Sequence, residues 1–113
     1  MKIFISLLAI FVTLNHVSSQ FSGGHSLVED INERARLLKI VKNNLCSFEG
    51  CWELHKVEKI TTQVVAGSLS IVHGIFEEVM EEEFYRGAVK IWEQPWMNFT
   101  EVTFNKEEVI EDL

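Results

Sequence analysis

Two cysteines and a few histidines are the side chains of this 113-residue chain best suited to metal or nucleophilic chemistry. Cys46 and Cys51 stand close together in the stretch CSFEGC. Such spacing is typical of a disulfide that closes a short loop when the chain passes through an oxidising compartment. A metal site would need more Cys or His at ligand spacing, and the nearest histidine, His55, falls on a strand-like run. We therefore expect no metal, no cofactor and no activated thiol, so the chain is not expected to be an enzyme.

Two further stretches are notable because they are apolar where a turn would ordinarily be polar. QVVAG, Gln63 to Gly67, lies between two strand-like runs, and Gln94-Pro95-Trp96-Met97 lies between two others. Turns that face water usually carry Asn, Asp, Ser or Gly, so apolar turns are typical of a surface that contacts a partner. Each stretch also has an ordinary interpretation, because valines are common in strands and a tryptophan can cover the edge of a core.

The start of the chain has the pattern of a secretory signal peptide. Lys2 precedes an apolar run from Ile3 to Leu14, and the small residues Val17-Ser18-Ser19 follow it. The run is shorter than the roughly 20 apolar residues of a membrane span, so we expect cleavage after Ser19. Residues 20–113 would then form one small secreted, extracellular domain without a membrane anchor.

The charge of the chain limits the partners that it can bind. The formal net charge is −7, and loss of Lys2 with the leader makes it about −8. An acidic domain is a poor partner for nucleic acid or anionic membrane. The acidic stretches EEVMEEEF (Glu77 to Phe84) and KEEVIEDL (Lys106 to Leu113) are expected to be a solvated loop and a solvated tail.

One helix is predicted between Asp30 and Leu45. Apolar residues recur there at steps of three and four and define one stripe: Ile31, Ala35, Leu38, Val41 and Leu45. Two starts have the spacing of a capping box, Ser26 with Glu29 and Asp30 with Glu33. The start at Asp30 is preferred, because it leaves Leu27-Val28 free to form a short first strand.

After CSFEGC the apolar pattern changes to period two, which predicts strands. The first run, WELHKVEKITT, alternates less cleanly, which favours a bulge there. The second run alternates clearly: Leu69, Ile71, His73 and Ile75 against Ser68, Ser70, Val72 and Gly74. A third run lies around Val89 and Ile91, and a last run extends from Asn98 to Phe104. Consecutive strands with short connections pair as an antiparallel meander. The fold class predicted is α+β, an antiparallel sheet of four to five strands wrapped around one α-helix.

In such a meander, successive turns alternate between the two ends of the sheet. QVVAG and Gln94-Pro95-Trp96-Met97 therefore share one end, and the acidic EEVMEEEF turn lies at the other. The glycines Gly23-Gly24, ahead of the first strand, can arrive beside the two apolar turns. Three distant segments are thus predicted to form one uncharged, apolar rim.

These segments together resemble the cystatins, reversible protein inhibitors of papain-like cysteine peptidases. TTQVVAGSL and VKIWEQPW are most similar to short secreted insect-type cystatins, and the resemblance runs from about Gly23 to Phe104. The resemblance implies a monomeric, secreted, competitive inhibitor of cathepsin L type or similar peptidases. In such an inhibitor Trp96 would be an aromatic anchor, Pro95 would stiffen its turn, and the glycines would allow close approach of the peptidase backbone. The residues implied to enter the active-site cleft are Gly23, Gly24, Gln63, Val64, Val65, Ala66, Gly67, Pro95 and Trp96. The alternative is a secreted, non-inhibitory binding or structural protein that keeps the same fold.

The chain also departs from the pattern of many secreted cystatins. Their paired disulfides in the C-terminal half are missing, with Gly87 and Phe104 near two of the expected cysteines. A Ser-Asn-Asp motif after the helix, used by some secreted relatives against asparaginyl endopeptidases, is also absent, so no such activity is expected. Asn98-Phe99-Thr100 is an N-glycosylation sequon close to Trp96, which makes Asn98 a candidate for modification.

Overall fold

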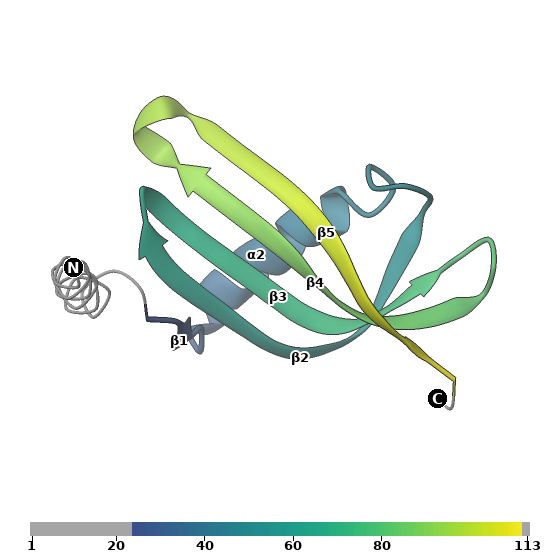
Figure 1. Cartoon of the computed structure of the whole chain (residues 1–113). Coiled ribbons are helices and arrows are strands. Elements are labelled where there is room, and N and C mark those ends of the chain that lie inside the picture. The colour runs from purple at the N-terminus through teal and green to yellow at the C-terminus, as the bar shows by residue number, and fades with distance from the viewer. Residues whose placement is uncertain (1–23, 112–113) are drawn as a thin grey trace, which may run out of the picture.

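The computed structural model describes residues 24–111, so the predicted signal peptide and Gly23 lie outside the described part. Its elements are β1 (Ser26–Leu27), α2 (Ile31–Asn43), β2 (Trp52–Val65), β3 (Gly67–Glu78), β4 (Glu83–Gln94), the 3-10 turn η1 (Pro95–Met97) and β5 (Phe99–Ile110). The strands form one antiparallel sheet in the order β1-β2-β3-β4-β5, and α2 crosses one face of it (Figure 1). This confirms the predicted fold class. Among residues 24–111, no helix has the length and apolar character needed to cross a bilayer.

Helix α2 begins where its sequence predicts, but it presents a different stripe to the sheet. The Asp30 carboxylate caps it by accepting a hydrogen bond from the backbone N–H of Glu33 at 2.9 Å. The buried side chains of the helix are Leu37 and Val41, whereas Ile31 is 78% exposed, so the predicted stripe is wrong in its first half. Arg34, one turn before Leu37 on the same face, donates a hydrogen bond to the carbonyl of Val28 and so replaces apolar contact there.

In β3, the face that packs against the helix is the one with fewer apolar residues in the sequence. Val72 and Phe76 are fully buried and pack in one cluster with Leu37 and Val41 of the helix. Leu69 and Ile71 lie on the opposite face, which we call the outer face. Period two establishes a strand, but it does not identify the buried face when both faces carry apolar residues.

An aromatic cluster joins β5 to the rest of the core. The Phe104 ring lies 5.3 Å from the ring of Phe48, 4.8 Å from that of Trp52 and 4.9 Å from that of Phe76. A β-carbon on Gly87 would lie 2.9 Å from the backbone oxygen of Asn105 and 3.1 Å from the Phe104 ring, so the glycine makes room for both. Ring packing therefore occupies the region near the two positions where the resemblance leads us to expect cysteines.

Two predictions about the connections are confirmed and one is wrong in part. Cys46 and Cys51 form a disulfide, and β2 has register shifts at Leu54/Lys56 and Val57/Lys59 that correspond to the expected bulge. The described part of the KEEVIEDL stretch, Lys106 to Glu111, is solvated as predicted, with only Ile110 half-buried, but it is not a tail, because β5 continues to Ile110 and pairs with β4. Hydrogen bonds to the neighbouring backbone can hold a strand whatever the charge of its outward side chains, which is why the acidic composition was misleading.

Candidate functional site

The β2–β3 turn and the β4–β5 turn lie side by side at one end of the sheet (Figure 1). Ala66 is the single residue between β2 and β3, and its carbonyl oxygen accepts two hydrogen bonds from β4. The donors are Nε1 of Trp92 at 2.9 Å and Nε2 of Gln94 at 3.1 Å. One backbone oxygen at the tip of the first hairpin therefore ties it to the base of the second.

The contact between the β2–β3 turn and β4 requires a glycine at position 67. Its backbone has φ +106°, a left-handed conformation that favours glycine. A β-carbon at this position would overlap the backbone carbonyl oxygen of Glu93 in β4. The sequence assigned this glycine to contact with a peptidase, whereas the structure gives a reason that needs no partner.

The second hairpin turn is short and internally hydrogen-bonded. Pro95 is the first residue of η1, where its fixed φ suits the turn, and Asn98 closes it with φ +51° and a hydrogen bond from its N–H to the carbonyl of Pro95 at 3.0 Å. Trp96 and Met97 between them are 66% and 64% exposed. Asn98 is also exposed, as glycosylation would require, and its modification stays a prediction.

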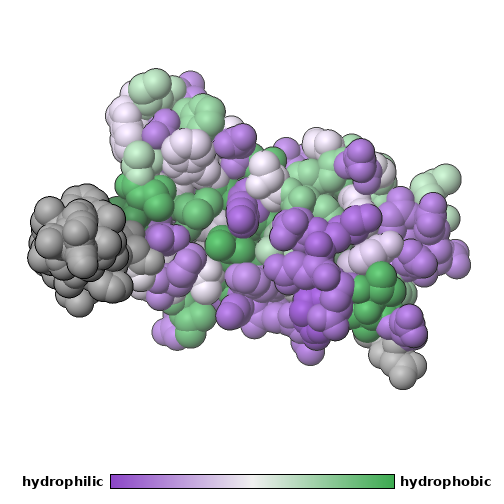
Figure 2. Space-filling model, viewed as in Figure 1, coloured by the Kyte–Doolittle hydropathy of each residue, from purple (hydrophilic) through white to green (hydrophobic). Residues whose placement is uncertain are grey.

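The first hairpin turn presents a matching apolar surface. Val64 is 62% exposed and Val65 36% exposed, Ala66 is exposed, and Gln63 is half-buried. Neither Val64 to Gly67 nor Pro95 to Phe99 contains a charged residue. Figure 2 shows hydrophobic side chains gathered at this end of the visible face and hydrophilic ones over much of the remainder.

The N-terminal segment approaches the same end of the sheet. Ser26 in β1 pairs with Thr62 in β2, so the antiparallel register directs Gly24 toward the end of β2 that carries Val64 (Figure 1). Gly24 is exposed, and nothing lies within 4 Å of the position that a β-carbon would take. Gly23 lies outside the described residues.

An ion pair anchors the second hairpin to the helix. Nη1 and Nη2 of Arg36 donate to the two carboxylate oxygens of Glu93 at 2.7 and 3.0 Å, and Arg36 also bonds Glu33. The hydrogen bonds from Arg36 lower the pKa of the Glu33 carboxyl, and the same contacts raise the pKa of Arg36. A bidentate pair has a fixed geometry, so it restrains the end of β4 from which the turn projects.

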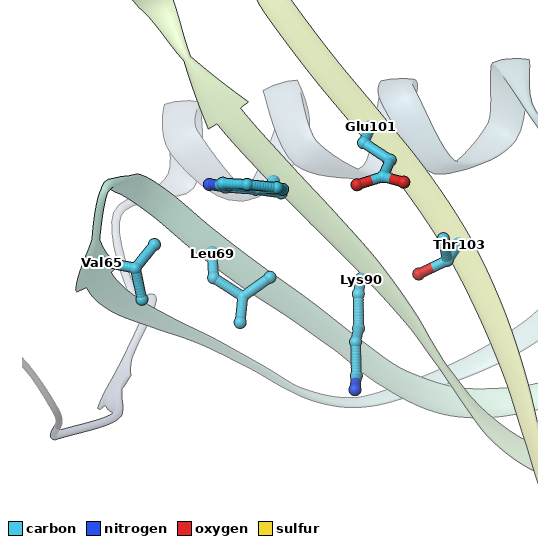
Figure 3. A pocket seen from close by; sticks show the side chains of 6 residues that line it. Val65, Leu69, Lys90, Glu101 and Thr103 are labelled. Carbon is cyan, nitrogen blue, oxygen red and sulfur yellow. The ribbon is translucent and has the colours of Figure 1, made fainter.

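A hollow on the outer face continues the apolar surface away from the turns. It has a volume of about 290 Å³ and is lined by Val65, Leu69, Lys90, Trp92, Glu101 and Thr103 (Figure 3). Trp92 packs edge-on against Phe99, with ring centroids 5.4 Å apart. Leu69, Trp92 and Phe99 were not indicated as site residues by the sequence. Met97 belonged to the predicted apolar turn Gln94-Pro95-Trp96-Met97 but was not among the residues implied to enter the cleft.

Replacing Trp92 by phenylalanine is expected to loosen the junction between the hairpins. The change keeps an aromatic ring but removes the N–H that bonds Ala66, so we expect a loss of about 1 kcal/mol in the free energy of unfolding and faster amide exchange around Ala66. Denaturant titration and hydrogen exchange measure the two effects. The control is Trp96→Phe, at an indole that is 66% exposed, and equal behaviour of both variants would contradict the assignment.

Two solved structures share this fold. The crystal structure of Al-CPI matches with a TM-score of 0.56 and 23% identity over 75% of this chain and 100% of its own. The crystal structure of a salivary cystatin from the soft tick Ornithodoros moubata matches with a TM-score of 0.60 and 19% identity over 76% of this chain and 98% of its own. A scan of protein-family models and a search of curated proteins found no match. At these identities the likeness establishes the cystatin fold of the chain and leaves its function to be argued from the site.

Proposed function

We propose that this chain, on its cystatin fold, is a secreted, reversible and competitive inhibitor of papain-like cysteine peptidases. The observation that carries the proposal is the pair of neutral, apolar hairpin turns held together at the Ala66 carbonyl. Val64 and Val65 project from one turn and Trp96 and Met97 from the other, all substantially exposed. Exposed apolar side chains on rigid turns are unfavourable in water, and their burial in an apolar cleft lowers the free energy of the complex.

Inhibition would occur by filling the cleft. Each Å² of apolar surface removed from water contributes roughly 25 cal/mol before the entropy of association is subtracted, so even a few side chains can anchor the complex. The junctions at Gly67 and Glu93 restrain the turns before binding, and less conformational entropy is then lost on docking. The Ala66 carbonyl oxygen already accepts two hydrogen bonds from β4, so it is not free to enter the oxyanion hole of a peptidase.

The secretory pathway is the compartment that suits this proposal. The Cys46–Cys51 disulfide is typical of an oxidising environment, and the apolar leader predicts export. The peptidase partner would be of the cathepsin L type or similar. The wedge would consist of Gly23, Gly24, residues 63–67, Pro95 and Trp96, to which the structure leads us to add Met97.

Titration of active-site-counted papain and a cathepsin L type peptidase tests the proposal. Wild-type protein is expected to inhibit reversibly, and rising substrate concentration is expected to relieve the inhibition. Val64→Ser should raise the inhibition constant about fivefold, since roughly 1 kcal/mol of apolar burial is lost. The matched control is Met80→Ser, an 81% exposed apolar residue in the β3–β4 turn at the opposite end of the sheet.

The outcomes separate the two functions considered. No inhibition by folded wild-type protein at micromolar concentration would favour the alternative, a non-inhibitory binding or structural protein on the same fold. If Val64→Ser and Met80→Ser weaken inhibition equally, the chain remains an inhibitor, but the hairpin edge, formed by Val64 to Gly67 and Pro95 to Met97, is rejected as its contact surface.

A further inference from the structure

Three metal-ligating side chains converge at the end of the sheet far from the hairpin edge. Glu53 and His55 project from β2 and Glu77 from β3, and one ligand atom of each lies within 4.8 Å of the other two. Nε2 of His55 is 2.7 Å from Oε1 of Glu77 and 3.5 Å from Oε1 of Glu53. The group contains an imidazole nitrogen as well as two carboxylates, which makes it chemically different from a purely acidic patch.

The backbone of the sheet determines this convergence. Glu53 and Glu77 are directly opposite partners in the antiparallel pair of β2 and β3, so their side chains share a face. His55 is two residues beyond Glu53, at the register shift between Leu54 and Lys56. Such a bulge alters the direction of a side chain relative to its neighbours.

The ring of His55 is held from a third strand. The Phe84 ring in β4 packs edge-on against it with centroids 5.0 Å apart, and Phe84 is itself the pairing partner of Glu77. Glu77 is the least exposed of the three, with a side chain 20% exposed against 41% for His55 and 66% for Glu53. Two of the three ligand groups are therefore oriented by packing within the sheet.

We propose that Glu53, His55 and Glu77 form a binding site for a divalent transition-metal ion of the Zn2+ class. One neutral imidazole and two carboxylates balance the charge of such an ion, and the nitrogen ligand favours Zn2+ over Mg2+ or Ca2+, which prefer oxygen. With bonds of about 2.0–2.1 Å, two ligand atoms of a tetrahedral site lie about 3.4 Å apart. The distance from His55 to Glu53 already fits, and that from His55 to Glu77 would lengthen as the ion replaces their hydrogen bond. The fourth position faces solvent and would hold water.

No metal was expected from the sequence, because too few Cys or His residues stand at ligand spacing and His55 falls on a strand-like run. Glu77 comes from the next strand, and the register alone puts it opposite Glu53. The acidic residues of the neighbouring β3–β4 hairpin, Glu78 and Glu81 to Glu83, add a negative field that attracts a cation.

Isothermal titration of the disulfide-bonded protein with ZnCl2, above the ordinary histidine pKa of about 6.5, tests the proposal. We expect one ion per chain with a dissociation constant in the micromolar range, and no saturable heat with MgCl2. His55→Ala and Glu77→Gln should each weaken Zn2+ binding at least tenfold, because loss of a residue that merely orients a ligand already costs about 10- to 100-fold in metal affinity. His73→Ala, which removes a histidine from the outer face of β3, is the matched control and should bind as the wild type does.

A spectroscopic readout distinguishes ligation from an effect on folding. In long-range 1H–15N spectra, Zn2+ is expected to shift the Nε2 signal of His55 and to leave the signals of His25 and His73 in place. Absence of saturable Zn2+ binding by the wild type would overturn the proposal. So would wild-type affinity in His55→Ala, or an unshifted His55 signal in the presence of bound ion.

Discussion

Gly67→Ala is expected to lower the free energy of unfolding by about 3 kcal/mol. Alanine strongly disfavours the φ of +106° that Gly67 adopts, and its β-carbon would overlap the carbonyl oxygen of Glu93. The collision is with backbone, so rotation of a side chain cannot relieve it. Either β4 must move away or the β2–β3 turn must change shape. Denaturant titration followed by tryptophan fluorescence measures the loss.

The matched control for this change is Gly24→Ala. Gly24 is exposed and has no atom within 4 Å of a new β-carbon, so the free energy of unfolding should change by less than about 0.5 kcal/mol. Equal stability of Gly67→Ala and wild type would contradict the structural reason given for this glycine. If stability were unchanged and peptidase inhibition fell, Gly67 would instead serve contact with the partner, as the sequence alone led us to expect.

Trp96→Ala is expected to raise the inhibition constant for papain about 30-fold, which corresponds to roughly 2 kcal/mol. Trp96 offers the largest apolar area on the hairpin edge and is 66% exposed in the free protein. Because most of its side chain is already exposed to water, truncation should leave the free energy of unfolding nearly unchanged. Progress curves at several inhibitor concentrations measure the rate constants, and the change should appear mainly as faster dissociation.

Met80→Ala provides the comparison for Trp96→Ala. Met80 is 81% exposed in the β3–β4 turn, at the end of the sheet opposite to Trp96, and its truncation should leave the inhibition constant within about twofold of wild type. A change of less than twofold in Trp96→Ala as well would remove this residue as an anchor. A loss of inhibition accompanied by a lower free energy of unfolding would show that Trp96 acts through the fold and not by contact.

Features that depend on neighbours in the chain could be predicted from the sequence. The helix start at Asp30 depends on a carboxylate that reaches the N–H of Glu33, and the disulfide joins Cys46 and Cys51 across a short loop. The alternation around Leu69 and Ile71 likewise indicated a strand. The adjacency of the two apolar turns followed because consecutive antiparallel strands reverse direction at each turn.

Features that depend on distant residues needed the tertiary structure. The alternation in β3 could not show that the face of Val72 packs in the core with the helix and that the face of Leu69 is the outer one, because apolar residues occur on both. The acidic end of β5 was predicted to be a solvated tail; its side chains are exposed, but its pairing with β4 makes it part of the sheet.

The sequence by itself determined an apolar, uncharged pair of turns at one end of an antiparallel sheet, since turn order and side-chain type are properties of the chain alone. Only the tertiary structure decided that Gly67 must be glycine, because the obstructing oxygen belongs to Glu93 in another strand. It likewise decided that Glu77 joins Glu53 and His55, because strand register is fixed by packing across the sheet.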